Sequence, residues 1–224
     1  MLSQAAINKR IHNTLPLARE GLPFILSSIV LSGLFYSLSF ALLSALFGVF
    51  ALFAVYFFRD PGRNPQGDET SVLTPADGRI IQAIPAEYPS DPTSEKAFKV
   101  SIFMSVFDVH VNRIPVAGKI GEITYRPGRF LVASLDKASD HNERNAVMLE
   151  TLGGRRIVIV QVAGLIARRI ACWIKQGDEV QAGQRFGLIR FGSRLDVYLP
   201  ADSRIVAVPG QRVRAGETII GYLS

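Results

Sequence analysis

Cysteine and histidine are scarce in this chain, and one long stretch of it carries no charge. Of the 224 residues, one is Cys (Cys172) and three are His. A single Cys excludes an internal disulfide framework. So few Cys and His also argue against zinc, because a closed structural zinc site takes four N or S ligands. We therefore expect no metal site.

Disordered and fibrous classes are excluded by the overall composition. Hydrophobic residues make up 48% of the chain, and its 19 Gly and 12 Pro follow no regular period, so a disordered or collagen-like chain is excluded. The formal net charge is +6, but no nucleic-acid motif or interleaved aromatic stripe accompanies it. The excess of Arg suits an anionic lipid surface rather than nucleic acid.

Residues 21–58 contain no charged side chain over 38 positions. One helix of that length would be about 57 Å long, against a hydrocarbon core of about 30 Å. We therefore predict a membrane-associated helical hairpin that turns near residues 35–39. Basic residues on both sides of this run favour a cytoplasmic location for both ends. A hairpin that enters one leaflet, or one buried in a soluble core, remains an alternative. Residues 1–20 fit an amphipathic surface helix or a frayed terminus equally.

Residues 59–224 form the predicted catalytic domain, and its pattern is mainly β. Short β-type runs alternate with Gly/Pro turns, as in a β-rich sandwich or barrel. The runs lie at 72–73, 79–84, 98–107, 119–124, 146–152, 156–162, 170–175, 185–191, 195–199, 205–208 and 218–223. Residues 130–137 give the one helical candidate of this region. The expected fold is therefore α+β, mainly β, behind an N-terminal helical hairpin.

A short near-repeat lies in the C-terminal part of the chain. The pattern G-x-x-V-x-A-G occurs at residues 177–183 and again at 210–216. Each copy predicts a turn, a short strand with one inward Val, and a second turn. This arrangement resembles the hairpins of lipoyl/biotinyl-type barrels, and two copies are too few for a solenoid.

Gly192-Ser193 is a candidate site for chemistry on the backbone itself. Glycine leaves its carbonyl carbon accessible, and the Ser193 hydroxyl can attack that carbon through a five-membered ring. The resulting ester can eliminate and leave dehydroalanine, which hydrolyses to a pyruvoyl group. Most Gly-Ser pairs are ordinary turns, so the pair alone does not indicate self-cleavage. The wider sequence context is needed to support that interpretation.

That context is a set of sequence blocks in a fixed order. Together they make the chain resemble the phosphatidylserine decarboxylase proenzymes of the short bacterial type. The blocks are Phe57-Phe58-Arg59-Asp60-Pro61, Thr74-Pro75-Ala76-Asp77-Gly78, Met104 to Arg113 (MSVFDVHVNR), Asn142-Glu143-Arg144-Asn145, Ala163 to Ile170 (AGLIARRI) and Phe191-Gly192-Ser193-Arg194.

The resemblance implies a self-processing, pyruvoyl-dependent enzyme. The chain would cut itself between Gly192 and Ser193, giving a β chain (1–192) and an α chain (193–224) that begins with the pyruvoyl group made from Ser193. The family converts phosphatidylserine to phosphatidylethanolamine and CO₂, through a Schiff base between the substrate amine and the pyruvoyl ketone. No external cofactor is implied. The expected location is the cytoplasmic side of a bacterial cell membrane, and a homo-oligomer stays open.

By the same resemblance, Asp77 is the acid of self-cleavage and His110 the active-site histidine. Asp77 could instead cap its own β-turn, and His110 could be a polar side chain where a strand from residue 98 ends. Longer family members carry a second His where this chain has Arg113, which stays protonated near neutral pH. Two alternatives are therefore open: His110 serves both stages, or Asp77 acts on Ser193 directly. His141 is a third, weaker candidate.

Arg168 and Arg169 are candidates for binding the substrate's phosphate or carboxylate, because a guanidinium presents a planar pair of donors. An ordinary surface ion pair is their alternative. The block 142–145 has no assigned role. The rival function is a non-catalytic, membrane-anchored β-barrel adaptor with lipoyl-like hairpins, which would have no use for Gly192-Ser193, Asp77 and His110.

Overall fold

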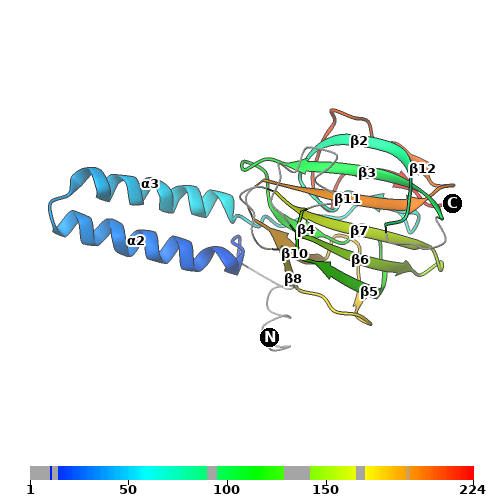
Figure 1. Cartoon of the computed structure of the whole chain (residues 1–224), viewed down its shortest axis with the longest axis horizontal. Helices are drawn as coiled ribbons and strands as arrows, with labels where there is room; N and C mark the ends of the chain where they lie inside the picture. Colours follow the sequence, from blue (N-terminus) through cyan, green and yellow to red (C-terminus); the bar gives the residue numbers. More distant parts are fainter. Residues whose placement is uncertain (1–10, 12–14, 90–94, 129–141, 165–169, 191) are drawn as a thin grey trace.

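A helical hairpin projects from one end of a curled β-domain (Figure 1). The computed structural model describes residues 11, 15–89, 95–128, 142–164, 170–190 and 192–224. The helical elements are η1 (Arg19–Gly21), α2 (Leu22–Ser37) and α3 (Ala41–Phe57). The strands are β1 (Ser71–Leu73), β2 (Gly78–Glu87), β3 (Lys96–Met104), β4 (Val111–Arg113), β5 (Gly118–Arg126), β6 (Arg144–Thr151), β7 (Arg156–Ala163), β8 (Ile170–Cys172), β9 (Glu179–Val180), β10 (Arg185–Ile189), β11 (Ser193–Pro200), β12 (Arg204–Ile205), β13 (Arg212–Val213) and β14 (Ile219–Tyr222).

The largest sheet has eight strands in the order β13-β2-β3-β11-β7-β6-β5-β9, and every pair in it is antiparallel. Two three-stranded sheets, β1-β14-β12 and β4-β10-β8, complete the domain. The long strand β11 lies inside the large sheet, between β3 and β7. Its two neighbours satisfy its backbone hydrogen bonds from both sides, so β11 is held as an interior strand.

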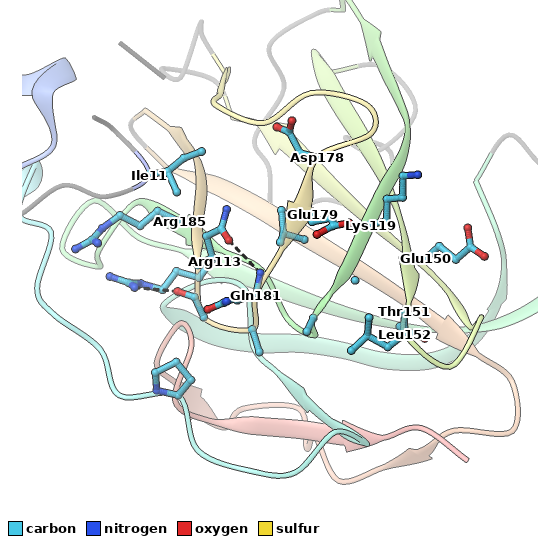
Figure 2. Close-up of a pocket in the computed structure, with 17 residues that line it drawn as sticks. Ile11, Arg113, Lys119, Glu150, Thr151, Leu152, Asp178, Glu179, Gln181 and Arg185 are labelled. Atoms are coloured by element: carbon cyan, nitrogen blue, oxygen red, sulfur yellow. Dashed lines mark hydrogen bonds between the residues drawn. The ribbon is translucent and has the colours of Figure 1, made fainter. Parts of the chain in front are cut away.

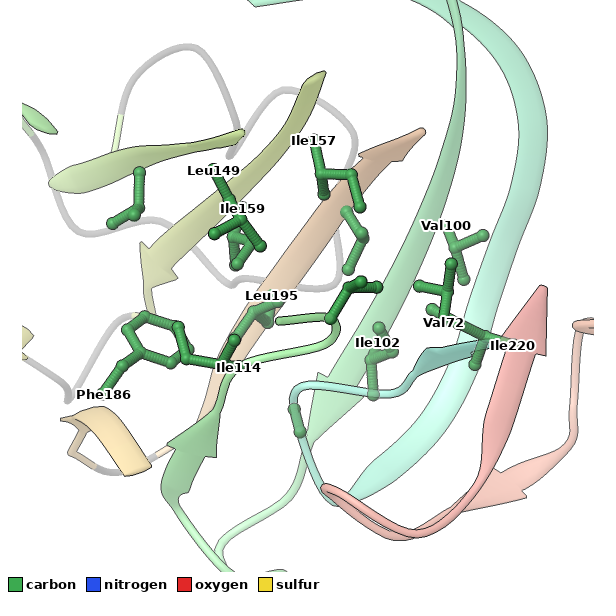
Figure 3. Packing of buried hydrophobic residues seen from close by; sticks show 14 of the residues in the cluster. Val72, Val100, Ile102, Ile114, Leu149, Ile157, Ile159, Phe186, Leu195 and Ile220 are labelled. Carbon is green, nitrogen blue, oxygen red and sulfur yellow. The ribbon is translucent and has the colours of Figure 1, made fainter. Parts of the chain in front are cut away.

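The main core fills the concave side of this sheet. Leu195 and Ile102 of neighbouring strands meet Ile114, Phe186 and Ile220 from the smaller sheets and loops (Figure 3). Along β11, Leu195, Val197 and Leu199 belong to this core, as the two-residue period of a strand requires. The alternate residues Arg194 and Asp196 point to the other face, where they form a buried ion pair with Nε and Oδ1 3.0 Å apart.

Helices α2 and α3 pack against each other through small and aromatic residues. The Ser32 and Ser44 hydroxyls each donate to the other residue's backbone carbonyl, at 2.8 and 2.9 Å. Such small polar contacts let two helices approach closely without water. The Phe35 and Phe47 rings stack with centroids 5.5 Å apart. The turn between the helices contains Ser39, whose φ of 62° is in the left-handed region.

The outward faces of the hairpin are apolar and exposed. Leu42, Leu52 and Val30 are 84%, 72% and 68% exposed. Residues Arg19–Ser37 form a helical stretch long and apolar enough to cross a membrane, and Ala41–Phe57 is a shorter apolar helix. With 16 and 17 residues, the two helices span about 24–26 Å each. An exposed apolar surface of this extent normally marks a contact with lipid or with another protein.

The base of the hairpin is anchored in the β-domain. Phe57, Phe58 and Trp173 belong to one buried cluster that joins α3 to the sheet of β4, β10 and β8. The Trp173 indole donates to the buried Glu20 carboxylate at 3.1 Å. The hairpin therefore continues into a packed junction rather than hanging from a free linker.

These observations confirm the predicted fold class, a mainly β domain behind two helices. The near-repeat is also confirmed: β9 and β13 are two-residue strands whose Val180 and Val213 are buried. Several strand predictions were wrong in their bounds. The runs 170–175, 185–191 and 205–208 end as strands at Cys172, Ile189 and Ile205, and no run predicted the short strand β4. The run 98–107 ends as a strand at Met104, because residues 105–108 form a turn in which the Asp108 carboxylate accepts from the Ser105 backbone N–H at 2.8 Å. The helical candidate 130–137 lies outside the described residues.

Candidate active site

Ser193 is the first residue of the central strand β11 and is fully buried. It lies opposite Met104 of β3 on one side and Ala163 of β7 on the other. Its hydroxyl oxygen is 4.0 Å from the Met104 sulfur, which is a weak acceptor. The candidate nucleophile therefore sits in a dry position with no strong hydrogen-bond partner of its own among the described residues.

Gly192 has a φ of 66°, in the left-handed region. A Cβ atom added there would meet nothing within 4 Å. The preference for glycine is therefore conformational rather than steric. Because this φ breaks the extended backbone, β11 starts at Ser193 and the peptide bond before it is presented at the end of the strand.

His110 follows the 105–108 turn and precedes β4, so it does not end the strand that starts near residue 98. Its ring is fully buried, with a centroid 4.3 Å from that of Phe57. Nδ1 lies 2.9 Å from the Asp108 carbonyl oxygen, so Nδ1 carries the proton and donates. Nε2 is buried and has no hydrogen-bond partner in the described part of the chain. Burial lowers the pKa of His110 to about 4, against the opposing effect of the bond to Asp108.

Asp77 lies in the turn that leads into β2. Its carboxylate accepts from Arg63 Nη2 at 2.8 and 3.0 Å and from the Ala215 backbone N–H at 2.7 Å. Burial raises the pKa of this carboxyl, although the Ala215 N–H and Arg63 oppose the rise. At Gly78, a Cβ atom would lie 2.1 Å from the Phe103 carbonyl oxygen, so only glycine fits there.

Asp77 and Ser193 lie at the same end of the large sheet, with β3 between their strands. Phe103 of β3 pairs with Arg79 on one side and with Arg194 on the other. Two strand spacings, about 10 Å, separate β2 from β11. The Asp108 charge also acts on Asp77, and the Asp108 carbonyl holds the His110 ring. Within the described ranges, no hydrogen bond joins Asp77, His110 and Ser193 to one another, so no closed triad is formed.

Arg113, at the position of the missing second histidine, is a structural tie. Its guanidinium donates to the Gly183 and Pro61 carbonyls at 3.0 and 2.9 Å and pairs with Asp60 at 3.3 Å. Asp60 also accepts from Arg185 Nε at 2.7 Å. Burial lowers the pKa of Arg113 to about 10, which leaves it protonated at neutral pH.

Three buried amide side chains form a hydrogen-bonded series near Ser193. None of them was a predicted site residue. Asn145 Nδ2 donates to Gln161 Oε1 at 3.0 Å, and Gln161 Nε2 donates to Asn112 Oδ1 at 2.8 Å. Asn112 Nδ2 in turn lies 3.6 Å from the Met104 sulfur. The signal in the sequence is Gln161, a lone amide within the otherwise apolar run of β7 that follows Arg156.

A cavity of about 1290 Å³ lies elsewhere, between the β5–β9 edge and the Arg113 tie (Figure 2). Its lining includes Lys119, Asp178 and Arg185 but none of Ser193, His110 and Asp77. The reactive positions are therefore not in this cavity. Arg168, Arg169, His141 and Phe191 lie outside the described residues. In the described part of the chain, no group of His, Cys, Asp and Glu could hold a metal ion.

Comparison with known proteins decides between an enzyme and an adaptor. A family model described as phosphatidylserine decarboxylase matches residues 50–221. The chain belongs to the phosphatidylserine decarboxylase family. It is 46% identical over 208 residues to the phosphatidylserine decarboxylase proenzyme of Syntrophus aciditrophicus, covering 92% of this chain and 96% of that one. It is 48% identical over 208 residues to the proenzyme of Geotalea uraniireducens, covering 93% and 97%.

Membership of the phosphatidylserine decarboxylase family makes the chain a decarboxylase, a lyase of phospholipid metabolism. The adaptor alternative is thereby rejected. The matched region contains Asp77, His110, Gly192 and Ser193. The roles of these four residues stay predictions, and the family membership adds weight to the chemistry considered next.

Proposed function

We propose that this decarboxylase is a self-processing proenzyme that cuts itself between Gly192 and Ser193 and carries a pyruvoyl group made from Ser193. The observation that carries the proposal is the backbone at this point. A left-handed Gly192 is followed by a fully buried serine at the start of an interior strand. The word "proenzyme" in the names of the relatives supports it.

The proposed cut balances without an added oxidant or reductant. Ser193 Oγ bonds to the Gly192 carbonyl carbon, the C–N bond breaks, and the free amine takes the hydroxyl's proton. Loss of the Ser193 α-proton then expels the Gly192 carboxylate and leaves dehydroalanine. One water replaces the nitrogen as ammonia and gives the ketone. The net change is one water consumed and one ammonia released.

The surroundings of Ser193 fit a small ketone. The position is buried and has the apolar residues Met104 and Ala163 beside it. A buried donor, Asn112 Nδ2, lies close by. It approaches the Met104 sulfur, and the Ser193 hydroxyl approaches the same atom. The ketone supplies a carbonyl that binds the substrate's amine and accepts the electrons of the breaking bond to CO₂.

We assign His110 the proton transfers. With Nδ1 held by the Asp108 carbonyl, Nε2 presents a lone pair in a water-poor site, and the lowered pKa keeps that lone pair free at neutral pH. Nε2 is thus suited to accept a proton during self-cleavage. An anionic substrate would favour the protonated ring. His110 would therefore take up a proton when the substrate binds and donate it to the α-carbon after CO₂ has left.

The proposed place of action is the cytoplasmic face of a bacterial membrane. Support comes from the exposed apolar sides of α2 and α3 and from the base of the hairpin. There Arg59 Nη2 and the Tyr56 hydroxyl both donate to the Phe107 carbonyl, at 2.7 and 3.1 Å. The Phe107 ring itself is 64% exposed. An aromatic ring beside an arginine suits the headgroup region, and this turn continues directly into His110.

The test of the proposed processing is the intact mass of the purified protein. We expect two chains of 192 and 32 residues whose summed mass differs from the full chain by one water gained and one ammonia lost. The smaller chain should react with a carbonyl reagent. A Ser193→Ala variant should stay full length and inactive. A wild-type protein that decarboxylates as one intact chain would overturn the proposal.

A further inference from the structure

Three buried amides form a series that ends beside the reactive serine. Asn145, Gln161 and Asn112 come from β6, β7 and β4, and each is at most 3% exposed. Asn145 and Gln161 face each other in the strand register. The two hydrogen bonds of the series have ordinary lengths of 3.0 and 2.8 Å. Buried amides must be hydrogen-bonded to be tolerated, and here each serves as the next one's partner.

The core itself gives no reason for these amides. The neighbours of Gln161 in β7 are buried apolar residues, Ile159 and Val160 among them. An apolar side chain at position 161 would avoid the desolvation of an amide. The three amides therefore have a role other than packing of the core.

The direction of the series is fixed by its bonds. An amide has one accepting end and one donating end. Asn145 gives its Nδ2 to Gln161 Oε1, and Gln161 gives its Nε2 to Asn112 Oδ1. Burial raises the pKa of the neighbouring Cys172 thiol, and a hydrogen bond with Asn145 is among the effects that oppose the rise. Asn112 must consequently present its donating end to the site.

That donating end has a poor partner. Asn112 Nδ2 lies 3.6 Å from the Met104 sulfur, and the Ser193 hydroxyl approaches the same sulfur at 4.0 Å. A thioether is a weak acceptor. An oriented, under-used N–H beside a nucleophile is what stabilises an oxyanion in acyl transfer.

We propose that Asn112 donates to the Gly192 carbonyl oxygen while Ser193 attacks, and that Gln161 and Asn145 are positioning residues that orient it. The inference rests on the proposed self-cleavage. As Oγ bonds to the carbonyl carbon, the carbonyl electron pair moves onto its oxygen, and Asn112 Nδ2–H stabilises that negative charge. When the C–N bond breaks, the charge returns to a carbonyl, and the donor is released.

The experiment measures the rate at which freshly purified proenzyme converts to two chains. Asn112→Asp keeps the size and the acceptor for Gln161 but removes the donating group. We expect it to slow cleavage by about 10²–10³-fold, as the loss of one oxyanion donor does elsewhere. Gln161→Met should slow cleavage less, because Asn112 remains but is no longer oriented. The double variant should cleave as slowly as Asn112→Asp alone, since Gln161 acts only through Asn112.

A matched control tests whether slower cleavage comes from the loss of the Asn112 donor or from the removal of any buried polar group. Ser101 is a fully buried residue of β3 whose hydroxyl has no partner in the described part of the chain. Ser101→Ala should cleave at the wild-type rate. The thermal midpoint of each variant is measured before cleavage. If Asn112→Asp does not fold, Asn112→Ser, which keeps a smaller donor, should cleave at an intermediate rate.

Hydroxylamine distinguishes the step at which Asn112 acts, because it cuts an ester but not the amide. Slow cleavage of Asn112→Asp with no hydroxylamine-sensitive chain supports the proposal. Wild-type cleavage by Asn112→Asp, additive slowing in the double variant, or an accumulated ester would each overturn it. A wild-type protein that never cleaves would instead overturn the proposed processing.

Discussion

The ring of Phe57, the last residue of α3, lies against the ring of His110 with the centroids 4.3 Å apart and the planes at 36°. The apolar hairpin therefore ends on the imidazole to which we assign proton transfer. This contact contributes to the burial that lowers the pKa of His110 to about 4. The aromatic neighbour and the hydrogen bond to Asp108 together set both the charge and the tautomer of the ring.

Phe57→Ala should move the pH dependence of self-cleavage. Admitting water to the ring restores the charged form, so the pKa of His110 should rise from about 4 toward its ordinary 6.5. Only the neutral ring accepts a proton, and the rate should therefore fall at a higher pH than in the wild type. Cleavage rates measured from pH 4 to 8 test this shift, and an unchanged acid limb would contradict the assigned role.

His110→Asn should flatten the acid side of the stability profile. With a pKa of about 4 folded and 6.5 unfolded, the unfolded wild type binds more protons between these values, so its stability falls as pH drops from about 6.5 to 4. The loss is about 3 kcal/mol over that window. Denaturant unfolding of uncleaved Ser193→Ala protein, with and without His110→Asn, measures it. Equal slopes in the two proteins would show that His110 does not titrate this way.

Asp77→Asn should slow or stop self-cleavage, because the amide can no longer act as a carboxylate toward Arg63 and the Ala215 N–H. Glu217→Gln is the matched control. Glu217 pairs with the same Arg63 at 3.2 Å but is partly exposed, and its loss should leave cleavage unchanged. Denaturing gels followed over time read both variants. Equal effects of the two substitutions would reduce Asp77 to a member of an ion-pair network.

Asp196→Asn should destabilise the protein by roughly 3–5 kcal/mol, because it removes the carboxylate charge that pairs with the fully buried Arg194 guanidinium. Replacing both residues by apolar ones of similar size, Arg194→Met with Asp196→Leu, should recover much of that loss. Denaturant midpoints of the two variants provide the comparison. A double variant no more stable than the single one would mean that the pair's geometry matters beyond its charge.

Phe107→Ser should weaken binding to vesicles of anionic lipid, because it removes an exposed ring at the base of the hairpin. Leu152→Ser is the control: Leu152 is 82% exposed but follows β6 at the end away from Asn145 and the site. Flotation of the two variants with the same vesicles measures the difference. If both lose binding equally, exposed apolar area in general, not this turn, governs it.

Much of the fold follows from local pattern. The uncharged run 21–58 predicts two helices because one helix would be too long, and two-residue periodicity predicts most strands. The two G-x-x-V-x-A-G copies predict the inward Val180 and Val213. These features depend on residues that are neighbours in sequence, so a single chain reveals them.

The site is less predictable because it depends on strand register between distant segments. The turn at 105–108 and the short β4 carry Asn112 to Met104, and Gln161 reaches Asn112 from 49 residues away. Neither contact leaves a local periodic signal. Arg113 looked like a lost histidine in sequence, whereas its contacts with Asp60, Pro61 and Gly183 identify it as a structural tie.

The place of β11 has a consequence for the lifetime of the enzyme. Residues 193–224 supply an interior strand of the large sheet together with β12, β13 and β14. If the chain is cut after Gly192 as proposed, unfolding would release a 32-residue peptide that is too short to build a core of its own. Reassembly of the two chains would then be bimolecular and would depend on protein concentration. The uncut chain could refold by itself, whereas the cut protein would not readily regain its fold after unfolding in dilute solution. Its durability is a matter of unfolding rate rather than equilibrium.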